Sequence, residues 1–331
     1  MSIEYHSLYL MTGLEQAQEY YEKCGRETLA RQFPECWERV AVGLVGEGSE
    51  CFGYDDAISQ DHDFGGGFCL WLIPGDYEKY GKAMEAAYNA LPQMAGDIKK
   101  RPPSPMGGDR VGVWSIPVFY RSCIGYSEAP PNNRAWMAIP DYRLATATNG
   151  ILWVDPEGEF TRIREALLKG YPEDVWLRKL AGEIHTMSQT GQYNYARCMQ
   201  RGDAVTAAIC LSEFVQAAMK TAFLLNHRYA PYYKWMHRGL RDLPLLADLE
   251  PLLRTLFLAP DQRDKWTGVD ILRWRCQINT ADDCVRVIEK ISDRIRAVLL
   301  DMGLSQADSD FLDHHTGAIL SRITDDALRR S

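Results

Sequence analysis

The first half of the chain alternates short apolar runs with polar, glycine-rich segments, a pattern typical of strands in a small sheet. The runs at residues 39–45, 68–73, 111–120 and 150–156 contain β-branched or aromatic residues and are bounded by glycine or proline. We expect Pro117 to end the third strand or to place it at an edge, because proline cannot donate a hydrogen bond to a strand ladder.

Helical spacing surrounds these strands and fills the second half. Residues 14–33 predict one helix, and Asp76 is expected to cap another that reaches Leu91. Three long helices are expected in the second half, at residues 172–191, 203–229 and 282–303. The pattern therefore predicts an α/β domain at residues 1–170, with a small mixed sheet and flanking helices, followed by an α-helical bundle domain at residues 171–331.

Composition excludes several protein classes. The 331 residues are 46% hydrophobic and 25% charged, which is typical of a soluble globular protein. No run approaches the roughly 18 uncharged apolar residues that a membrane helix needs. The amino terminus has neither a basic region nor an apolar core, so we expect no secretory signal. Nine cysteines are scattered singly without a CxxC pair, which indicates reduced thiols and a cytoplasmic protein.

Charge is unevenly distributed along the chain. The net charge is −8, and residues 1–165 hold 24 acidic side chains against 15 lysines and arginines. This acidic half argues against a broad nucleic-acid surface, which would need a basic stripe. It also suggests a place where carboxylates gather around a cation.

One segment combines the residue types needed to hold a nucleotide. Gly48-Ser49 follows the first predicted strand, and glycine there lets a phosphate oxygen approach the backbone amides closely. Twelve residues after Ser49, Asp61 and Asp63 stand at alternate positions. On an extended backbone these two carboxylates project together and can share a hard cation such as Mg²⁺. The plainer interpretation of this acidic segment is a solvated loop.

The order strand, Gly-Ser, Asp-x-Asp, strand resembles the DNA polymerase β-like nucleotidyltransferase superfamily. Residues 48–63 look more closely like an uncharacterised bacterial group of nucleotidyltransferase-like proteins, as does the downstream segment at residues 228–235. The architecture is similar to that of the kanamycin and streptomycin nucleotidyltransferases, in which a helical domain closes over the nucleotide. The resemblance implies that Gly48 and Ser49 contact the phosphates and that Asp61 and Asp63 hold the metals.

The sequence departs from this superfamily at the third metal-binding acid. The corresponding position, on the strand near residues 110–114, is occupied by Gly112. Asp109 lies nearby at a different backbone position. Loss of one carboxylate is expected to weaken the catalytic metal more than the nucleotide-bound metal, so the sequence favours nucleotide binding more firmly than turnover.

Three further residues are candidates for the site. Ser59 either contacts a phosphate or braces the acidic loop. Lys234, in the aromatic segment, either provides a point charge for a triphosphate or lies at the surface over its aromatic neighbours. Glu213 shares a helix face with Lys220 and is a candidate for the base that activates the acceptor hydroxyl, by the resemblance to the kanamycin-type enzymes. Its alternative role is in a surface ion pair.

Adjacent histidines at 314 and 315 invite a metal interpretation. They diverge by about 100° on a helix and have no third ligand nearby in sequence, so a surface pair is expected.

These features predict a Mg²⁺- or Mn²⁺-dependent nucleotidyltransferase. It would move a nucleotidyl group, AMP from ATP, to a hydroxyl of a small molecule or protein. The alternative is a nucleotide-binding or regulatory protein that keeps the fold without efficient chemistry, because Gly112 replaces the expected acid. We expect no membrane partner.

Overall fold

The computed structural model describes residues 11–60, 64–102, 110–269 and 278–330. The chain divides into two compact units. The first, here the sheet unit, comprises residues 1–130 and 143–169. The second, here the helical unit, comprises residues 131–142 and 170–331. The helical unit therefore includes a short segment that lies within the first half of the sequence.

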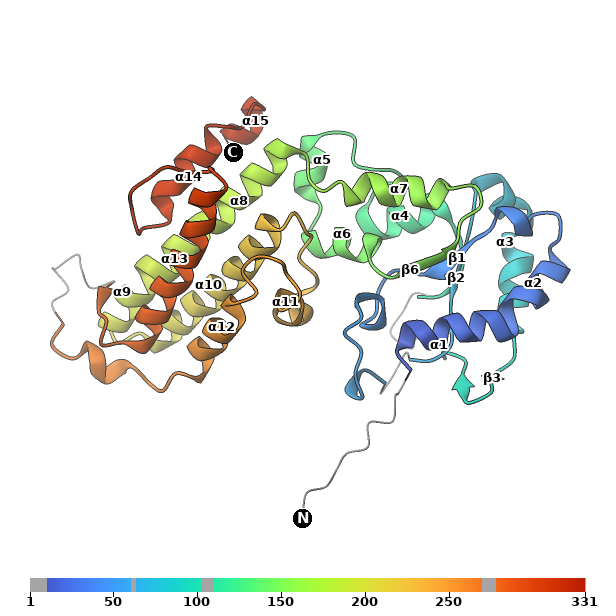
Figure 1. The fold of residues 1–331 in the computed structure, drawn as a ribbon, viewed down its shortest axis with the longest axis horizontal. Helices are drawn as coiled ribbons and strands as arrows, with labels where there is room; N and C mark the ends of the chain where they lie inside the picture. The colour runs from blue at the N-terminus through green and yellow to red at the C-terminus, as the bar shows by residue number, and fades with distance from the viewer. Residues whose placement is uncertain (1–10, 61–63, 103–109, 270–277, 331) are drawn as a thin grey trace, which may run out of the picture. The chain divides into compact units, whose positions relative to one another are not determined.

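A mixed four-stranded sheet forms the centre of the sheet unit (Figure 1). Its strands are β1 (Ala41–Leu44), β2 (Cys69–Leu72), β5 (Gly112–Ser115) and β6 (Ile151–Val154). The strand order is β5-β2-β1-β6, with β1 antiparallel to both β2 and β6 and with β2 parallel to β5. A separate two-stranded hairpin pairs β3 (Met94–Ala95) with β4 (Ile98–Lys99).

Helices surround this sheet. They are α1 (Gly13–Tyr20), the π-helical turn η1 (Tyr21–Gly25), α2 (Arg26–Gln32), α3 (Pro74–Asn89), α4 (Ile116–Ile124), α6 (Asp141–Thr148) and α7 (Glu159–Leu168). Short 3₁₀ turns are η2 (Trp37–Arg39), η3 (Glu50–Phe52) and η4 (Ile58–Gln60). Successive β2 side chains point to opposite faces, so Leu70 packs with the α1–α3 side while Trp71 contacts Phe119 of α4 and Phe160 of α7.

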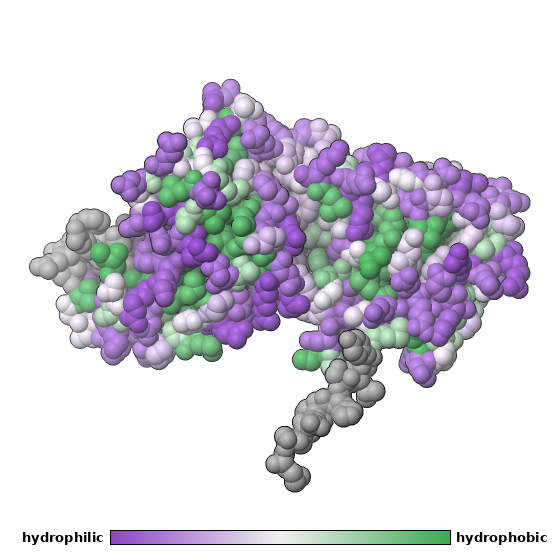
Figure 2. Space-filling model, in the orientation of Figure 1, coloured by the Kyte–Doolittle hydropathy of each residue, from purple (hydrophilic) through white to green (hydrophobic). Residues whose placement is uncertain are grey.

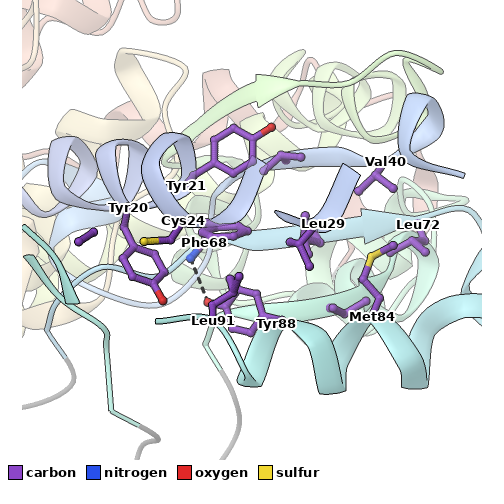
Figure 3. Close-up of a cluster of buried hydrophobic side chains, with 14 of the residues drawn as sticks. Tyr20, Tyr21, Cys24, Leu29, Val40, Phe68, Leu72, Met84, Tyr88 and Leu91 are labelled. Carbon is purple, nitrogen blue, oxygen red and sulfur yellow. Dashed lines mark hydrogen bonds between the residues drawn. The ribbon is translucent and has the colours of Figure 1, made fainter. Parts of the chain in front are cut away.

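The core on the α1–α3 side is built around Phe68, which directly precedes β2. Tyr20 and Tyr21 pack their rings against Phe68, with ring centroids 6.1 and 5.1 Å away (Figure 3). Tyr88 of α3 packs edge-on against the same ring, and its hydroxyl accepts the Phe68 N–H at 3.2 Å. Burial of these rings fixes the start of β2 relative to α1 and α3.

In the helical unit, α10 packs along α8 and η5, and α13 packs on α12 and contacts η5 and α10 (Figure 1). Its longer helices are α8 (Glu173–Met187), which continues as the π-helical η5 (Ser188–Tyr195), α10 (Ala204–Leu225), α12 (Leu249–Leu258) and α13 (Asp283–Asp301). The shorter ones are α5 (Asn133–Ala138), α9 (Ala196–Gln200), α11 (Tyr233–Leu240), η6 (Arg263–Trp266), α14 (Asp313–Leu320) and α15 (Asp326–Arg329).

Within the described ranges, α10 is long and apolar enough to cross a membrane by length and composition. Its 18-residue window has a mean hydropathy of 1.4, and 61% of that window is buried inside the protein, where α10 packs on α8 and η5. This is the burial expected of the central helix of a bundle. On the face of the molecule in Figure 2, hydrophobic residues are interspersed among hydrophilic ones.

The predicted class, an α/β part with a small mixed sheet and a helical part, is confirmed. Asp203 and Asp282 cap α10 and α13, at the beginnings of two of the long helices that the sequence predicts. Asp76, however, lies in the first turn of α3 and does not cap it, because its carboxylate accepts two hydrogen bonds from Arg39, each 2.8 Å. The third strand, β5, ends at Ser115 just before Pro117 and lies at the edge of the sheet, as expected. Pro117 itself lies in the first turn of α4, where its missing N–H costs nothing.

The expected surface pair of histidines is wrong for one member. His314 is exposed, but His315 is completely buried. The His315 ring lies between the Ser305 hydroxyl and the Ser309 carbonyl, each 2.9 Å away. These two partners satisfy the ring and make it part of the core.

Candidate functional site

Four strand ends meet at one edge of the sheet. Gly43 of β1 pairs with Cys69, the first residue of β2, and Cys69 pairs with Gly112, the first residue of β5. Leu44 pairs with Ile151, the first residue of β6. The end of β1 therefore lies beside the beginnings of the other three strands. The candidate residues Gly48, Ser49 and Gly112 are gathered at this edge.

Residues 46–49, here the Gly48 turn, leave β1 in a conformation that needs glycine. Gly46 and Gly48 have φ values of +130° and +133°, which L side chains rarely adopt. Asn149 fixes the base of the turn, because its amide accepts the Gly46 N–H at 2.9 Å and donates to the Gly46 carbonyl at 2.8 Å. In the part of the chain that the structure describes, the N–H groups of residues 47–49 donate no hydrogen bond. They remain available to an anion.

A buried ion pair lies directly behind this turn. Glu50 is 3% exposed and its carboxylate accepts a hydrogen bond from Nη2 of Arg101, which is 6% exposed. A Cβ added to Gly48 would lie 2.5–2.6 Å from the Glu50 carboxyl atoms, so the carboxylate is seated against the Gly48 backbone. Neither member of this pair was singled out from the sequence. Glu50 simply follows Gly48-Ser49, and Arg101 ends a short basic run, so neither position indicates in the sequence that its side chain is buried.

Arg101 is only partly satisfied by Glu50. Its Nε and Nη1 atoms are buried and have no hydrogen-bond partner within the described residues. Burial raises the pKa of the neighbouring Cys51 thiol and of the Tyr88 hydroxyl, so both stay neutral near pH 7. Among the groups that the structure describes around Arg101, Glu50 supplies the negative charge.

Gly112 is tied to a carboxylate from a different element. Its φ is +115°, and an added Cβ would lie 3.2 Å from both carboxylate oxygens of Glu85 on α3. Glu85 also accepts the Val113 N–H at 2.8 Å. The sequence places no acid at position 112, but the fold brings the Glu85 carboxylate against it. Sequence reasoning missed Glu85, because a helix-borne acid gives no sign of which strand it faces.

The remaining sheet-unit candidates are placed in part. Ser59 lies in η4, and both its N–H and its hydroxyl bond to Oδ1 of Asp56 at 3.0 Å, which is the bracing role. These bonds hold the pKa of Asp56 below its usual range. Asp61, Asp63 and Asp109 lie outside the described residues.

Glu213 lies on α10 in the helical unit and is exposed. Lys220, its expected neighbour on the same face, pairs instead with Glu183 of α8, at 3.4 Å. Burial raises the pKa of Glu183, and the Lys220 ammonium partly opposes that shift. A shielded carboxyl with a raised pKa is better suited to accept a proton near neutral pH than an exposed one. Glu183 is thus a second candidate for the base.

Lys234 is exposed at the start of α11 and lies over the Trp235 ring, with Nζ 5.1 Å from its centroid. The helical unit also contains a less exposed polar cluster, formed by Asp141, Tyr171 and Lys179. The Asp141 carboxylate accepts hydrogen bonds from the Tyr171 hydroxyl and the Lys179 ammonium, each 2.7 Å long. Burial and the Asp141 charge raise the pKa of Tyr171, which remains a hydrogen-bond donor over the physiological pH range.

No three His, Cys, Asp or Glu side chains form a metal-binding group within the ranges that the structure covers. The two carboxylates expected to hold Mg²⁺, Asp61 and Asp63, lie outside those ranges. The donor set of the proposed metal is therefore carried by the sequence pattern alone.

Comparison with known proteins gives one family match. Residues 136–236 match a family described as a domain of unknown function (DUF4037). This segment contains α8, α10, Glu183, Glu213 and Lys234. No curated protein and no solved structure matches the chain.

Proposed function

We propose that the protein is a Mg²⁺-dependent nucleotidyltransferase that moves a nucleotidyl group, AMP from ATP, to a hydroxyl of a small molecule or protein. In this reaction the acceptor oxygen forms a bond to the α-phosphorus. The bond from that phosphorus to the pyrophosphate oxygen breaks, and the acceptor proton passes to a base. The fold proposed for the sheet unit is that of the nucleotidyltransferase superfamily.

The observation that carries this proposal is the Gly48 turn with its available N–H groups at the end of β1, beside the beginnings of β2 and β5. Asp61 and Asp63 belong to the connection between that turn and β2. In the proposed site, this order of segments would combine a phosphate-binding turn with two carboxylates, which is the minimum for phosphoryl chemistry.

In the proposed reaction the chain's own residues hold the nucleotide and move the proton. Gly48 and Ser49 orient the phosphates through backbone N–H groups and the Ser49 hydroxyl. When bound, Mg²⁺ on Asp61 and Asp63 neutralises charge on the phosphates. Glu213 or Glu183 accepts the acceptor proton, and Lys234 contributes a positive charge.

A second candidate function is nucleotide binding without efficient turnover. The observation in its favour is the φ of +115° at Gly112, which makes any acid at that position strained. Glu85 lies against this glycine, but its carboxylate already accepts the Val113 N–H. One of its oxygens is therefore less available to bind a metal ion.

The test is ligand-induced thermal stabilisation, followed by a turnover assay. We expect Mg-ATP to raise the Tm of the parent protein and expect the double variant Asp61→Asn/Asp63→Asn to lose that rise. The matched control is Asp56→Asn, an exposed acid of the same loop that is bonded to Ser59. An undiminished rise in the double variant would reject the proposed site.

Release of pyrophosphate and AMP from Mg-ATP separates the two candidate functions. Transfer to water provides a measurable reaction even when the acceptor is absent. A parent that binds Mg-ATP but releases no more pyrophosphate than the Asp61→Asn/Asp63→Asn variant supports the binding function.

The base is identified with two substitutions on neighbouring helices. Loss of a general base lowers turnover by about 10²–10⁴-fold. We therefore compare Glu183→Gln with Glu213→Gln, with Lys220→Met as a control that removes only the partner of Glu183. Nucleotide binding is expected to stay unchanged in all three.

A further inference from the structure

The Glu50 carboxylate occupies a position suited to a phosphoryl oxygen. It lies against the α-carbon side of Gly48, where any side chain would collide with it, and it accepts a hydrogen bond from the buried Arg101. A Cβ at Gly13 would in turn lie 2.6 Å from the Glu50 Cβ, so the Glu50 side chain fills a slot between two glycines. Glycine on both sides makes room for a group that carries negative charge.

Arg101 offers more hydrogen bonds than Glu50 uses. The guanidinium has five N–H donors, yet the carboxylate binds Nη2 alone, and Nε and Nη1 have no partner among the described residues. A buried arginine with unpaired donors is costly, and a tetrahedral phosphoryl group could accept from several of them at once.

We propose that Glu50 is an internal occupant of an anion site formed by the Gly48 turn and Arg101, and that a phosphoryl group binds there by displacing it. This inference rests on the proposed function for the source of the phosphoryl group, a nucleoside triphosphate. It assigns Arg101 as a phosphate-binding residue and Glu50 as the group that competes with the phosphate.

The surroundings favour exchange of one anion for another. Arg164 of α7 adds a second cation next to Cys51, and its Nη1 is also buried and unpaired within the described residues. Both guanidinium groups therefore have a buried nitrogen without a partner among the described residues. Glu50 belongs to a single 3₁₀ turn that ends at Gly53 in the left-handed conformation, so it can move without breaking a longer helix.

Pyrophosphate binding without divalent metal tests the proposal, because the two members of one ion pair should then act in opposite directions. In EDTA, calorimetry is expected to give about tenfold tighter pyrophosphate binding for Glu50→Gln than for the parent, since a competing charge is removed. Arg101→Gln is expected to lose binding. A structural ion pair predicts instead that both variants bind equally or more weakly than the parent, and that result would overturn the proposal.

Stability changes are separated from binding by matched variants. Asp76→Asn breaks the Arg39–Asp76 pair of the same unit and should leave pyrophosphate binding at the parental level. Where Glu50→Gln does not fold, Glu50→Asp takes its place, because the shorter carboxylate retreats from Gly48 and should also tighten binding. Parental or weaker binding by that variant would likewise count against the proposal.

The same experiment distinguishes this inference from the proposed function. Pyrophosphate binding in EDTA does not require Asp61 or Asp63, so its presence in the Asp61→Asn/Asp63→Asn variant upholds the anion site whether or not Mg-ATP binds. ATP and inorganic phosphate, titrated in parallel, show whether the site prefers a nucleotide or a free anion. Free phosphate that binds more tightly than ATP would reject the nucleotide as its source.

Discussion

Two buried charged side chains, Asp282 in the helical unit and Arg101 in the sheet unit, differ in how completely their hydrogen-bonding groups are satisfied. Asp282 of the helical unit is fully buried and accepts four hydrogen bonds: from the N–H groups of Cys284 and Val285, from the Tyr195 hydroxyl and from the Trp266 indole. Arg101 of the sheet unit has one charged partner, Glu50, and two buried nitrogens without a partner in the described part of the chain. Asp282 thus stabilises its unit, whereas Arg101 is left with capacity for another group.

The comparison distinguishes a buried charge that stabilises the fold, Asp282, from one that can bind a ligand, Arg101. A buried charge is tolerated when every lone pair or proton is satisfied, and Asp282 meets that condition by joining a helix cap to two aromatic side chains. Arg101 fails it beside a turn that only glycine can form. Strain and incomplete hydrogen bonding at the same place are typical of sites that bind ligands.

The largest expected effect is at Asp282. Asp282→Ala leaves four donors without an acceptor and should lower the free energy of unfolding by about 3–5 kcal/mol. Urea unfolding followed by circular dichroism measures this loss. Asp203→Ala, which removes an exposed cap from α10, is the control and should cost less. Equal losses of unfolding free energy in the two variants would show that the buried hydrogen bonds of Asp282 contribute no more than an exposed helix cap.

Replacing both members of the Glu50–Arg101 pair should cost little stability, in contrast to the loss expected at Asp282. Glu50→Leu alone strands the Arg101 charge and should cost about 3 kcal/mol. Glu50→Leu with Arg101→Met should return to within about 1 kcal/mol of the parent, because an incompletely bonded buried pair can be replaced by apolar residues at little cost. Urea unfolding of both variants tests this. A double variant less stable than the single one would show that Arg101 contributes to stability.

Glu289 of α13 should make the helical unit less stable as pH rises. Burial raises its pKa to about 7, although Gln192 donates to the carboxylate and opposes the shift. The native state then holds a proton that the unfolded state has already lost, so stability falls between about pH 4.5 and pH 7. Glu289→Gln should remove this slope, which is on the order of 3 kcal/mol across that range. Unfolding midpoints of parent and variant at several pH values measure it, and parallel curves would contradict the assignment.

The smallest effect is expected at Gly112. Gly112→Ala places a methyl group 3.2 Å from the Glu85 carboxylate at a φ of +115°, and should cost about 1–2 kcal/mol. Gly125→Ala, also at positive φ but with open space around it, reports the backbone strain alone. Thermal unfolding of the two variants, with and without Glu85→Ala, separates strain from contact. If Glu85→Ala leaves the cost of Gly112→Ala unchanged, the contact carries none of it.

Much of the local structure was predictable from the sequence. Helix α13 begins after Asp282 and α10 after Asp203, as their apolar spacing and capping residues indicate. The strands were found near their expected positions because short apolar runs bounded by glycine carry a local signal. The Gly48 turn was also predictable from local sequence, because its conformation depends on consecutive residues.

The errors share a physical cause, which is contact between residues far apart in the sequence. Asp76 does not cap α3 because it binds Arg39, 37 positions away. His315 is buried because Ser305 and Ser309 satisfy its ring.

The sequence by itself determined the class of the two units, the capped helices and the Gly-Ser turn, because propensity, capping and apolar spacing act over a few residues. Only the tertiary structure decided which charges are buried and what they meet. Arg101 reaches Glu50 from 51 positions away, and Glu85 reaches Gly112 from a separate helix. Hydrogen bonding and desolvation act through space, so the candidate anion site became visible only when the folded chain brought these groups together.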